Sequence, residues 1–569
     1  MHPATATTAQ ALFDEHRNTL DRALQAITQR DYWSAYSESL KQYPPEAVSE
    51  AKANFDALLN RHFTLAGTAA VGRAGAEQSP YGFALGVSYD QYDADQLMTR
   101  QQQALPAWRD AGAEARVGVC LEALQRLNAL SPTMAHAVMH TSGQAYMMAF
   151  QAGGPHAQDR GLEAVAYAWR AMSEVPGSAC WTKPQGKQPA LQLDKRWHIV
   201  PRGISLVIAC STFPTWNTYP GLFASLATGN PVLVKAHPGA ILPVAMSVKV
   251  LQDVLEEAGF DPALVSLVVD TVEAPVSQVL ALDARVKLVD FTGSSQFGNW
   301  LEANARQARV FTEKAGINSV IIDSVADIRA VAKNLAFSLS LYSGQMCTTT
   351  QAIYIPRDGI RSGEQHLSFD EVAATLADAV QTLLADNARA CQFIGAIQSQ
   401  ATAERIAACR ALGTVVLESE SREHPDFAGA RIHTPLLLKV DAADRAAFSE
   451  ERFGPISFLI ATDDTAHSLQ VAAEVIAEKG AMTLGFYSTD DAMLERAEQL
   501  AIDCAVALSV NFDSSVYVNQ SAAFSDFHAT GGNPAANACI TDSAFVAQRF
   551  VTVQSRRHAQ IEGAGDAQL

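Results

Sequence analysis

The strongest constraint on the fold is an alternation of short apolar runs with helical stretches that starts near residue 203. Each run is rich in β-branched residues and is followed by a segment with helical spacing. The first series contains four such runs: GISLVIAC (203–210), NPVLVKA (230–236), ALVSLVVD (263–270) and ARVKLVDFTG (284–293). Strands that alternate with helices indicate βαβ units and a parallel sheet. We therefore expect a doubly wound nucleotide-binding domain in this region.

A second alternating series begins near Asn318. Its expected strands are NSVIID (318–323), AIYIP (352–356), TVVLES (414–419), SFLIATDD (457–464) and TLGFYS (483–488). Its expected helices cover residues 326–343, 369–384 and 466–478. Because the pattern again alternates, it predicts a second α/β domain. The fold class is α/β, with two doubly wound domains.

The chain length supports more than one domain, because a single core stops growing at about 250–300 residues and this chain has 569. Residues 1–60 have a helical pattern, in which four apolar side chains can share one face. These are Leu12, Leu20, Leu24 and Ile27. Residues 62–82 are rich in glycine and small side chains, which predicts a loop or linker. The polar tail after about Val553 is expected to fray.

Composition and charge exclude several classes of protein. The net charge is −18, from 60 acidic and 42 basic residues, so a nucleic-acid partner is not expected. No apolar window reaches the roughly 18 residues that a membrane span needs, and no secretory leader precedes the first helix. The eight cysteines are scattered without a C-x-x-C pair, which argues against a disulfide framework and a structural zinc. We expect a cytoplasmic protein without membrane contact or metal.

The segment LYSGQMCTTT (341–350) carries the first chemical candidate, Cys347. It ends a helical stretch and precedes the apolar run AIYIP. A cysteine at such a junction, flanked by glycine and small hydroxyl residues, has solvent access and nearby backbone donors for an oxyanion. Cys347 is therefore a candidate nucleophile. The ordinary alternative for a lone cysteine is a buried, inert thiol.

Two further segments lie just upstream. In FTEKAGINSVIID (311–323), Glu313 precedes a turn and could serve as general base for hydrolysis of a covalent intermediate. In LVDFTGSSQFGNW (288–300), Gly293 and Ser294 follow an expected strand and open an expected helix. Glycine lets the backbone approach a pyrophosphate at a helix N-terminus. Taken singly, a solvated glutamate and a plain strand–turn–helix would explain both segments.

Taken together, FTGSSQFG, TEKAG and GQMC resemble, in this order, the signature of the aldehyde dehydrogenase superfamily. Glu313 and Cys347 are 34 residues apart, as the catalytic pair of that family is. Upstream, VIACSTFPTWNTYPGLFASLATGNPVLVKAHP (207–238) resembles the family's segment with an N-F-P turn, LATGN and a lysine. Downstream, EERFGPISFL (450–459) resembles its E-x-F-G-P motif. The resemblance covers about residues 95–530.

The resemblance implies an NAD(P)-dependent oxidation of an aldehyde. Cys347 would attack the aldehyde to form a thiohemiacetal and then a thioester, and Glu313 would activate the water that releases the acid. It also implies five cofactor contacts, to the adenosine ribose, the pyrophosphate and the nicotinamide end. In that order they are Lys235, then Gly293 and Ser294, then Glu451 and Phe453.

The resemblance also implies an aldehyde dehydrogenase-like organisation with a small oligomerisation arm and a helical N-terminal extension. Residues 1–90 would be the extension and a linker, and 91–312 the NAD(P)-binding domain, with arm strands near 185–200. Residues 313–510 would be the catalytic domain. Residues 511–569 would return to the cofactor domain and contribute an oligomerisation strand and a tail. A homodimer or homotetramer is expected.

Two departures from the family pattern bear on the chemistry. The family carries an asparagine in its N-F-P turn, whose amide completes the oxyanion hole. Counting back from LATGN places Thr212 there, while Asn217 fits only if the loop is five residues shorter; Thr212 is preferred, and both stay open. NAD-preferring members often carry a glutamate three residues after the lysine, where this chain has Pro238. Loss of that carboxylate favours NADP over NAD.

The N-terminal extension, the STFPTWN turn and KAHP resemble the phenylacetic acid degradation protein PaaN group. That resemblance implies a CoA-linked semialdehyde of phenylacetate catabolism as the substrate. Two alternatives remain. In a CoA-acylating dehydrogenase a thiol replaces the water, and Glu313 argues against it. A catalytically impaired nucleotide-binding paralogue would account for the Thr212 departure.

Overall fold

The first sheet contains five parallel strands in the order β10-β9-β6-β7-β8. Its strands are β6 (Ile204–Ile208), β7 (Val232–Lys235), β8 (Val265–Val268), β9 (Val286–Thr292) and β10 (Arg309–Glu313). The helices α9 (Tyr219–Ala227), α10 (Leu242–Glu257), α11 (Ser277–Leu282) and α12 (Ser295–Asn304) connect them. Strands β6, β7 and β8 are buried throughout, as expected for a parallel sheet covered on both faces. The computed structural model describes residues 3–559.

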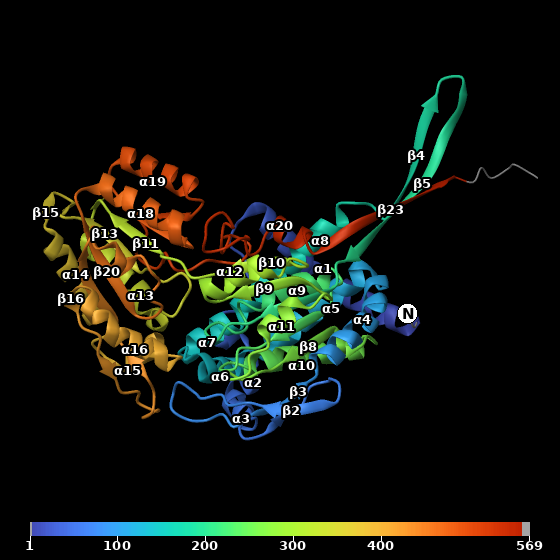
Figure 1. The fold of residues 1–569 in the computed structure, drawn as a ribbon, viewed down its shortest axis with the longest axis horizontal. Coiled ribbons are helices and arrows are strands. Elements are labelled where there is room, and N and C mark those ends of the chain that lie inside the picture. Colours follow the sequence, from blue (N-terminus) through green and yellow to red (C-terminus); the bar gives the residue numbers. More distant parts are fainter. Residues whose placement is uncertain (1–2, 560–569) are drawn as a thin grey trace, which may run out of the picture.

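The second sheet has seven strands in the order β16-β19-β20-β13-β11-β21-β22. They are β11 (Ser319–Ile322), β13 (Ala352–Pro356), β16 (Thr414–Leu417), β19 (Leu436–Asp441), β20 (Ile456–Thr462), β21 (Thr483–Tyr487) and β22 (Ala507–Val510). Its helices are α13 (Ile328–Ser340), α14 (Phe369–Leu383), α15 (Asn387–Ile394), α16 (Gln400–Cys409), α17 (Arg445–Phe448), α18 (Thr465–Lys479) and α19 (Asp491–Asp503). All pairings are parallel except that of β16 with β19. In Figure 1 this lobe lies at the left, in yellow and orange.

The α/β fold class is therefore confirmed, with each predicted strand found within a few residues of its expected place. Strands β10, β19 and β22 were not predicted. In the first sheet the chain runs outward from β6 to β8 and then crosses to β9 on the other side of β6. Such a reversal opens a crevice beyond the carboxyl ends of the strands, where ligands bind in doubly wound sheets.

The N-terminal part forms more structure than expected. It contains α1 (Pro3–Gln29), η1 (Leu40–Gln42), α2 (Pro45–Ser49), α3 (Ala51–Asp56), β1 (His62–Phe63), β2 (Ala70–Ala74) and β3 (Ser88–Tyr92). The segment predicted as a linker thus supplies two strands that pair with β3. Most of β2 is exposed, so its apolar pattern is weak, and its pairing with a strand 14 or more residues away is not a local signal.

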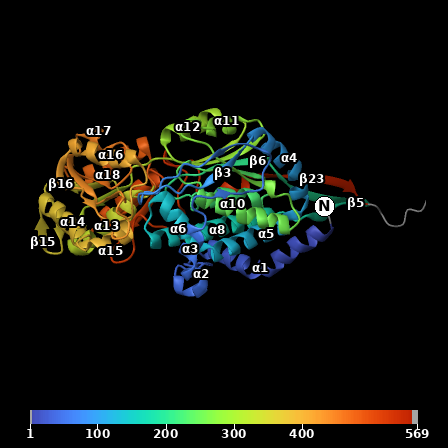
Figure 2. The same cartoon turned by 90° about the horizontal axis from the view of Figure 1, so that it is seen from below.

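A helical layer follows: α4 (Ala94–Asp110), α5 (Gly112–Ala129), α6 (Ser131–Ser142), α7 (Tyr146–Gly153) and α8 (Pro155–Ser173). Helix α1 packs against α5 and α8, and the view from below shows it lying along this layer (Figure 2). Of the four apolar residues predicted to share its face, Leu20 and Ile27 are fully buried, whereas Leu12 and Leu24 pack at the edge. The extension is therefore part of the main core.

A three-stranded antiparallel arm projects from the body (Figure 1). It consists of β4 (Ser178–Gln185), β5 (Gln188–Pro201) and β23 (Phe550–His558). The tail predicted to fray after Val553 instead continues as β23 because it pairs with β5; the rest of that tail, residues 560–569, lies outside the described residues. At the start of β23, the buried Arg549 makes two hydrogen bonds to Asp290 of β9, of 2.6 and 2.8 Å. This pair fixes the returning chain to the first sheet.

Within residues 3–559, none of the helices combines the length and apolar character required to cross a bilayer. All eight cysteines are free thiols.

Candidate active site

Three side chains from distant parts of the sequence meet between the two sheets. The Cys347 Sγ lies 3.5 Å from Nε2 of His528, and the same nitrogen lies 3.1 Å from Oε1 of Glu313. The three reactive atoms are all within 4.8 Å of one another. The structure therefore brings the predicted nucleophile and the predicted base together, and adds an imidazole between them.

Glu313 is the last residue of β10, at the carboxyl end of the first sheet. Its backbone oxygen accepts a hydrogen bond from the amide of Gly293, 3.0 Å away, which ties the carboxylate to the predicted glycine turn. Its side chain is 1% exposed. Placing an acidic residue at the end of a buried parallel strand points it into the crevice rather than into the core.

Cys347 follows the short turn η3 (Leu341–Gly344). Tyr342, Ser343 and Gly344 all have positive φ, of 51°, 48° and 62°. Such backbone strain persists only where the surroundings hold it. Here the hydroxyl of Tyr342 donates to the backbone oxygen of Ser142 at 2.5 Å, and that of Ser343 donates to Ile394 at 2.9 Å.

At Gly344, a Cβ would approach the backbone oxygen of Gly454 to 2.4 Å, so only glycine fits at the start of the GQMC motif. On the other side of the cysteine, the amide of Asn318 donates to the backbone oxygens of Cys347 and Thr349, at 2.7 and 3.1 Å. The loop is thus held from both ends. The sulfur is thus held in place although Cys347 forms no disulfide bond.

The electrostatics of the site oppose a free thiolate. Burial, reinforced by the negative charge of Glu313, raises the pKa of the Cys347 thiol well above its usual value. Burial also acts to raise the pKa of the Glu313 carboxyl, but His528, together with hydrogen bonds from Cys347 and Thr292, outweighs it, so that pKa is lowered overall. A thiol with a raised pKa needs a nearby proton acceptor to become nucleophilic.

His528 was not predicted from the sequence. It lies on the segment between β22 and α20 (Ser543–Ala547), which has no strand or helix pattern. Its ring packs edge-on against Trp216, with centroids 4.5 Å apart, and the residue is 5% exposed. Among the described residues its Nδ1 has no hydrogen-bond partner. A single histidine in a segment without helical or strand periodicity belongs to no motif, so nothing in the sequence pattern indicates its role.

The two candidates for the oxyanion hole lie in different places. Asn217 lines the pocket of Cys347, and its Nδ2 donates to Oε2 of Glu313 at 3.1 Å. Thr212 is not among the pocket-lining residues; its backbone oxygen accepts from Gln144 at 2.8 Å. The backbone amide of Asn217 donates to the oxygen of Phe213 at 3.1 Å, in a turn before α9.

Three of the five predicted cofactor residues lie at the carboxyl edge of the first sheet. Lys235 ends β7 and forms an ion pair of 2.6 Å with the buried Asp270. Gly293 and Ser294 are exposed directly after β9, and the Ser294 hydroxyl caps α12 by accepting from the amide of Phe297 at 3.3 Å. An exposed helix N-terminus beside a lysine fits the pyrophosphate and ribose of a dinucleotide.

Glu451 and Phe453 lie on the catalytic side of the crevice, between α17 and β20. Burial raises the pKa of the Glu451 carboxyl to about 7, and its charge is felt at Cys347. Arg405 donates to the backbone oxygen of Phe453 at 2.6 Å. This segment therefore faces Cys347 from the second lobe, opposite the edge with Lys235 and Ser294.

A cavity of about 750 Å³ opens from Cys347 toward the solvent. His528 lies beside the sulfur, Asn217 also lines the cavity, and eleven of the lining residues are aromatic or methionine. The aromatic and methionine residues are Tyr32, Trp33, Met147, Met148, Phe213, Trp216, Phe337, Met346, Phe393, Phe512 and Tyr517. A volume of this size suits a small organic ligand.

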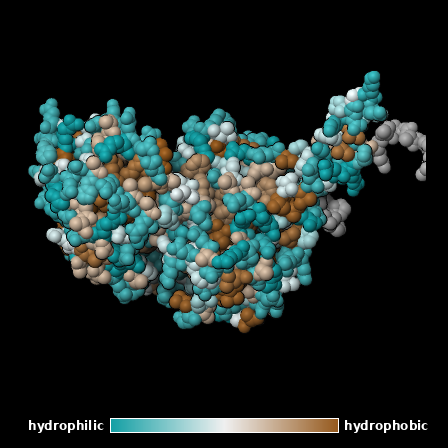
Figure 3. Space-filling model, turned by 45° about the horizontal axis from the view of Figure 1, so that its top comes forward, coloured by the Kyte–Doolittle hydropathy of each residue, from teal (hydrophilic) through white to brown (hydrophobic). Residues whose placement is uncertain are grey.

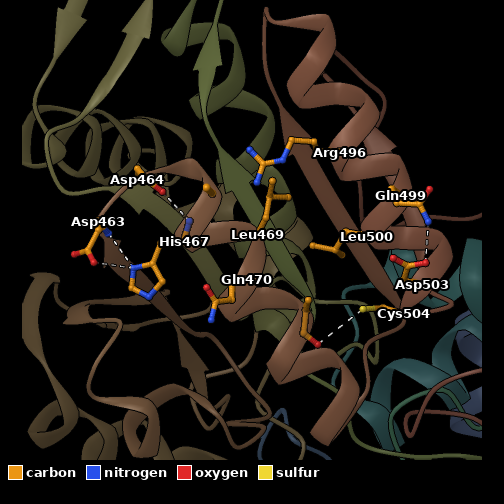
Figure 4. A pocket seen from close by; sticks show the side chains of 12 residues that line it. Asp463, Asp464, His467, Leu469, Gln470, Arg496, Gln499, Leu500, Asp503 and Cys504 are labelled. Atoms are coloured by element: carbon orange, nitrogen blue, oxygen red, sulfur yellow. Dashed lines mark hydrogen bonds and ion pairs between the residues drawn. The ribbon is translucent and has the colours of Figure 1, made fainter.

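Another hollow, of about 850 Å³, lies between α18 and α19 (Figure 4). Its side chains bond to one another: His467 accepts from the amide of Asp463, and Gln499 donates to Asp503. None of the predicted site residues lines it. The candidate chemistry is therefore confined to the crevice with Cys347.

Comparison with known proteins agrees with this geometry. The sequence profile of the aldehyde dehydrogenase family matches residues 86–524. A crystal structure of an NAD-dependent aldehyde dehydrogenase from Burkholderia multivorans is 55% identical, with a TM-score of 0.95 over 97% of this chain and 100% of that one. A structure of 1-pyrroline-5-carboxylate dehydrogenase from Thermus with bound NAD, at 19% identity and a TM-score of 0.72 over 93% and 99% of the chains, shares the fold.

Among curated sequences, 1-pyrroline-5-carboxylate dehydrogenase of Geobacillus kaustophilus is 28% identical over 53% of this chain and 57% of its own length. The chain thus aligns with between about a third and just over half of the length of the curated relatives it matches. The profile match covers far more than half of the chain, and the fold and the ordered motifs agree with it. The chain belongs to the aldehyde dehydrogenase family.

Proposed function

We propose that this protein oxidises an aldehyde to a carboxylic acid with NAD⁺ or NADP⁺, through a covalent intermediate on Cys347. The observation that carries the proposal is the cluster of Cys347, His528 and Glu313, of which Cys347 and His528 line one pocket. Aldehyde, water and oxidised cofactor give acid, reduced cofactor and a proton. The similarity to an NAD-dependent aldehyde dehydrogenase over the whole chain supports it.

The first step is the transfer of the Cys347 thiol proton to Nε2 of His528, which lies 3.5 Å away. This requires the tautomer with its proton on Nδ1. The imidazolium that forms donates from Nε2 to Oε1 of Glu313, 3.1 Å away, and that carboxylate stabilises the positive charge. The thiolate then forms a C–S bond to the aldehyde carbon, and the carbonyl oxygen becomes an oxyanion.

The second half releases the acid. When bound, the nicotinamide supplies the hydride acceptor, and a thioester on Cys347 results. Glu313 then accepts a proton from water, whose oxygen attacks the thioester carbon. The C–S bond breaks, and the departing thiolate recovers its proton from His528. Burial of Glu313 keeps bulk water from competing for its hydrogen bonds.

Asn217, with the backbone amide of Cys347, is proposed to hold the oxyanion in place of Thr212. Asn217→Ala should lower kcat about 10²–10³-fold, as loss of one such donor does in comparable sites. Thr212→Val should stay within a few-fold of the wild type, because Thr212 bonds to the core through its backbone. Steady-state kinetics of both variants decides; the reverse ranking would return the role to Thr212.

The cofactor preference rests on two opposing features. Pro238 leaves out the carboxylate that often follows the lysine, which favours NADP, whereas the ion pair of Lys235 with Asp270 places another buried carboxylate beside that lysine. Because the two effects oppose each other, we propose use of either cofactor with NADP favoured. Ratios of kcat/KM for NAD⁺ and NADP⁺ measure this.

The experiment that tests the function is a panel of aldehydes assayed with both cofactors and with analysis of the product. The resemblance to the PaaN group adds a CoA-linked semialdehyde of phenylacetate catabolism to that panel. We expect free acid as the product. An acyl-CoA product that forms only with added CoA would identify a CoA-acylating dehydrogenase. If no aldehyde led to reduction of either cofactor, the protein would be a catalytically impaired nucleotide-binding paralogue.

We also propose that the protein is a homodimer or homotetramer joined through the arm. Trp181, Leu191, Val551 and Val553 are apolar and exposed on its strands, and Figure 3 shows the arm standing clear of the body. A projecting sheet that exposes these few apolar side chains is stabilised by a second copy. Light scattering should give a multiple of 60.9 kDa; a monomer would refute the proposal. The cytoplasmic location stays a prediction.

A further inference from the structure

The pocket of Cys347 has a wall that comes from outside the family profile. Tyr32, Trp33, Ser34 and Glu38 line it, yet the profile starts at residue 86. We refer to residues 30–38 as the N-terminal strap. It follows α1 and contains no helix or strand up to η1. Because the strap has no regular secondary structure, side-chain and backbone contacts with its neighbours must fix its position at the pocket.

Those contacts are specific. The Ser34 hydroxyl donates to Oδ2 of Asp159 at 2.5 Å, and the amide of Ala35 donates to Oδ1 at 3.0 Å. Asp159 lies on α8 and is itself 4% exposed. A buried carboxylate that accepts two hydrogen bonds from one segment fixes that segment's register. The strap is thus anchored against the helical layer.

The strap also contacts the segment that carries His528. Arg30 donates to the backbone oxygen of Phe524 at 3.2 Å, and Ser525 donates back to the Arg30 oxygen at 3.3 Å. The rings of Trp33 and Phe524 lie 4.9 Å apart. The guanidinium of Arg30 lies 3.9 Å from the centroid of Phe527, next to His528. The N-terminal strap, which forms the outer wall of the pocket, is therefore connected by these contacts to the segment that carries His528.

The chemistry of the wall indicates what it can bind. Trp33 and Tyr32 add aromatic surface to a pocket whose inner walls are already aromatic and methionine-rich. At the mouth, the hydrogen bond from His156 lowers the pKa of Glu38, which stays negative. Among the described lining residues the only guanidinium is Arg160, and it is buried and bonded to Glu163 at 2.8 Å. None of these described lining residues offers an unpaired positive charge to neutralise the phosphates of CoA.

We propose that the N-terminal strap is part of the substrate site, and that it selects aldehydes with an uncharged, aromatic-sized body over short aliphatic and polyanionic ones. This rests on the proposed function and deepens it. The aldehyde carbon would lie at Cys347, and the ring would extend along Phe213 and Trp216 toward Trp33 and Tyr32. Aromatic pairs in such a site add binding that a short chain cannot obtain.

The test compares phenylacetaldehyde, propanal and a CoA-linked semialdehyde on the full-length protein. Wild type should show a higher kcat/KM for phenylacetaldehyde than for the other two. Trp33→Ala should lower kcat/KM for phenylacetaldehyde about tenfold, mainly through KM, and should lower it much less for propanal, so that the ratio between the two substrates falls. Tyr32→Ala should act in the same direction. Tyr32 is 69% exposed, so its removal does not threaten folding.

Trp169→Ala is the matched control. Trp169 packs on Phe13 of α1, with ring centroids 4.9 Å apart, but lies outside this pocket. It should alter stability without altering the ratio between phenylacetaldehyde and propanal. The inference is overturned if both strap variants keep the wild-type ratio, if they lower both activities equally, or if the CoA-linked substrate is preferred. Oxidation of propanal by wild type would still uphold the proposed function, whereas no turnover of any aldehyde would refute it.

Discussion

Cys347→Ala is expected to abolish aldehyde-dependent reduction of NAD⁺ and NADP⁺, because Cys347 is the one thiol among the described residues that line the pocket. The sulfur borders the cavity of about 750 Å³ and has both His528 and Glu313 within reach. Losing the nucleophile of a covalent mechanism costs on the order of 10⁶-fold in comparable enzymes. Stopped-flow absorbance of the reduced cofactor would measure the loss down to the background.

Cys504→Ala is the matched control, since Cys504 is a half-buried free thiol in the hollow between α18 and α19. It should retain wild-type kcat. Turnover that persists in Cys347→Ala would refute the covalent mechanism. Binding of the cofactor, measured by fluorescence titration, should survive the substitution and separate lost chemistry from lost folding.

The thiol pKa gives an independent readout of the same cysteine. Burial and Glu313 raise the pKa of Cys347, so its thiolate fraction is small at neutral pH and grows as the pH rises. Alkylation by iodoacetamide should therefore be slow at pH 7 and accelerate steadily toward alkaline pH, with activity lost in parallel. A labelling rate that is flat with pH would contradict this account of the site.

The sequence predicts the parts of this fold that depend on local pattern. Buried strands such as β6 and β20 are continuous apolar runs, which a parallel sheet requires on both faces. Strand β10 escaped prediction because it lies at a sheet edge and its first residues are exposed. Strand β2 escaped because it is mostly exposed and its partner, β3, lies 14 or more residues further along the chain.

The candidate site residues divide in the same way, into those that a local sequence pattern indicates and those that only tertiary contacts place. Cys347 and Glu313 stand in short motifs whose spacing is readable, and the structure places them together. His528 depends on a long aperiodic segment that crosses back between the lobes. Arg160 holds that segment through Ser521 and the Asp526 backbone, at 3.1 and 3.0 Å. The choice between Thr212 and Asn217 depends on the length of a loop, which one sequence does not fix. Such positions are set by tertiary contacts and have no local signature.

His528→Gln is expected to lower kcat about 10²–10⁴-fold, the range of a lost general base. Glutamine can still donate to Glu313, but it cannot accept the thiol proton. Without the imidazole, the thiol loses the acceptor that lies 3.5 Å from the sulfur, so its raised pKa alone sets the pH at which the thiolate forms. The kcat/KM profile should then shift to higher pH, and activity should recover in part in alkaline buffer. Steady-state kinetics from pH 6 to 10 measures both effects.

His140→Gln is the matched control, because His140 is equally buried, at 4% exposure, and hydrogen-bonds to Ser79 outside the pocket. It should change stability but not the pH profile. A purely structural His528 would give a uniform loss at every pH, with the profile in place. The alkaline shift separates the two roles, since only a group that exchanges a proton with the sulfur can set the pH at which the sulfur becomes nucleophilic.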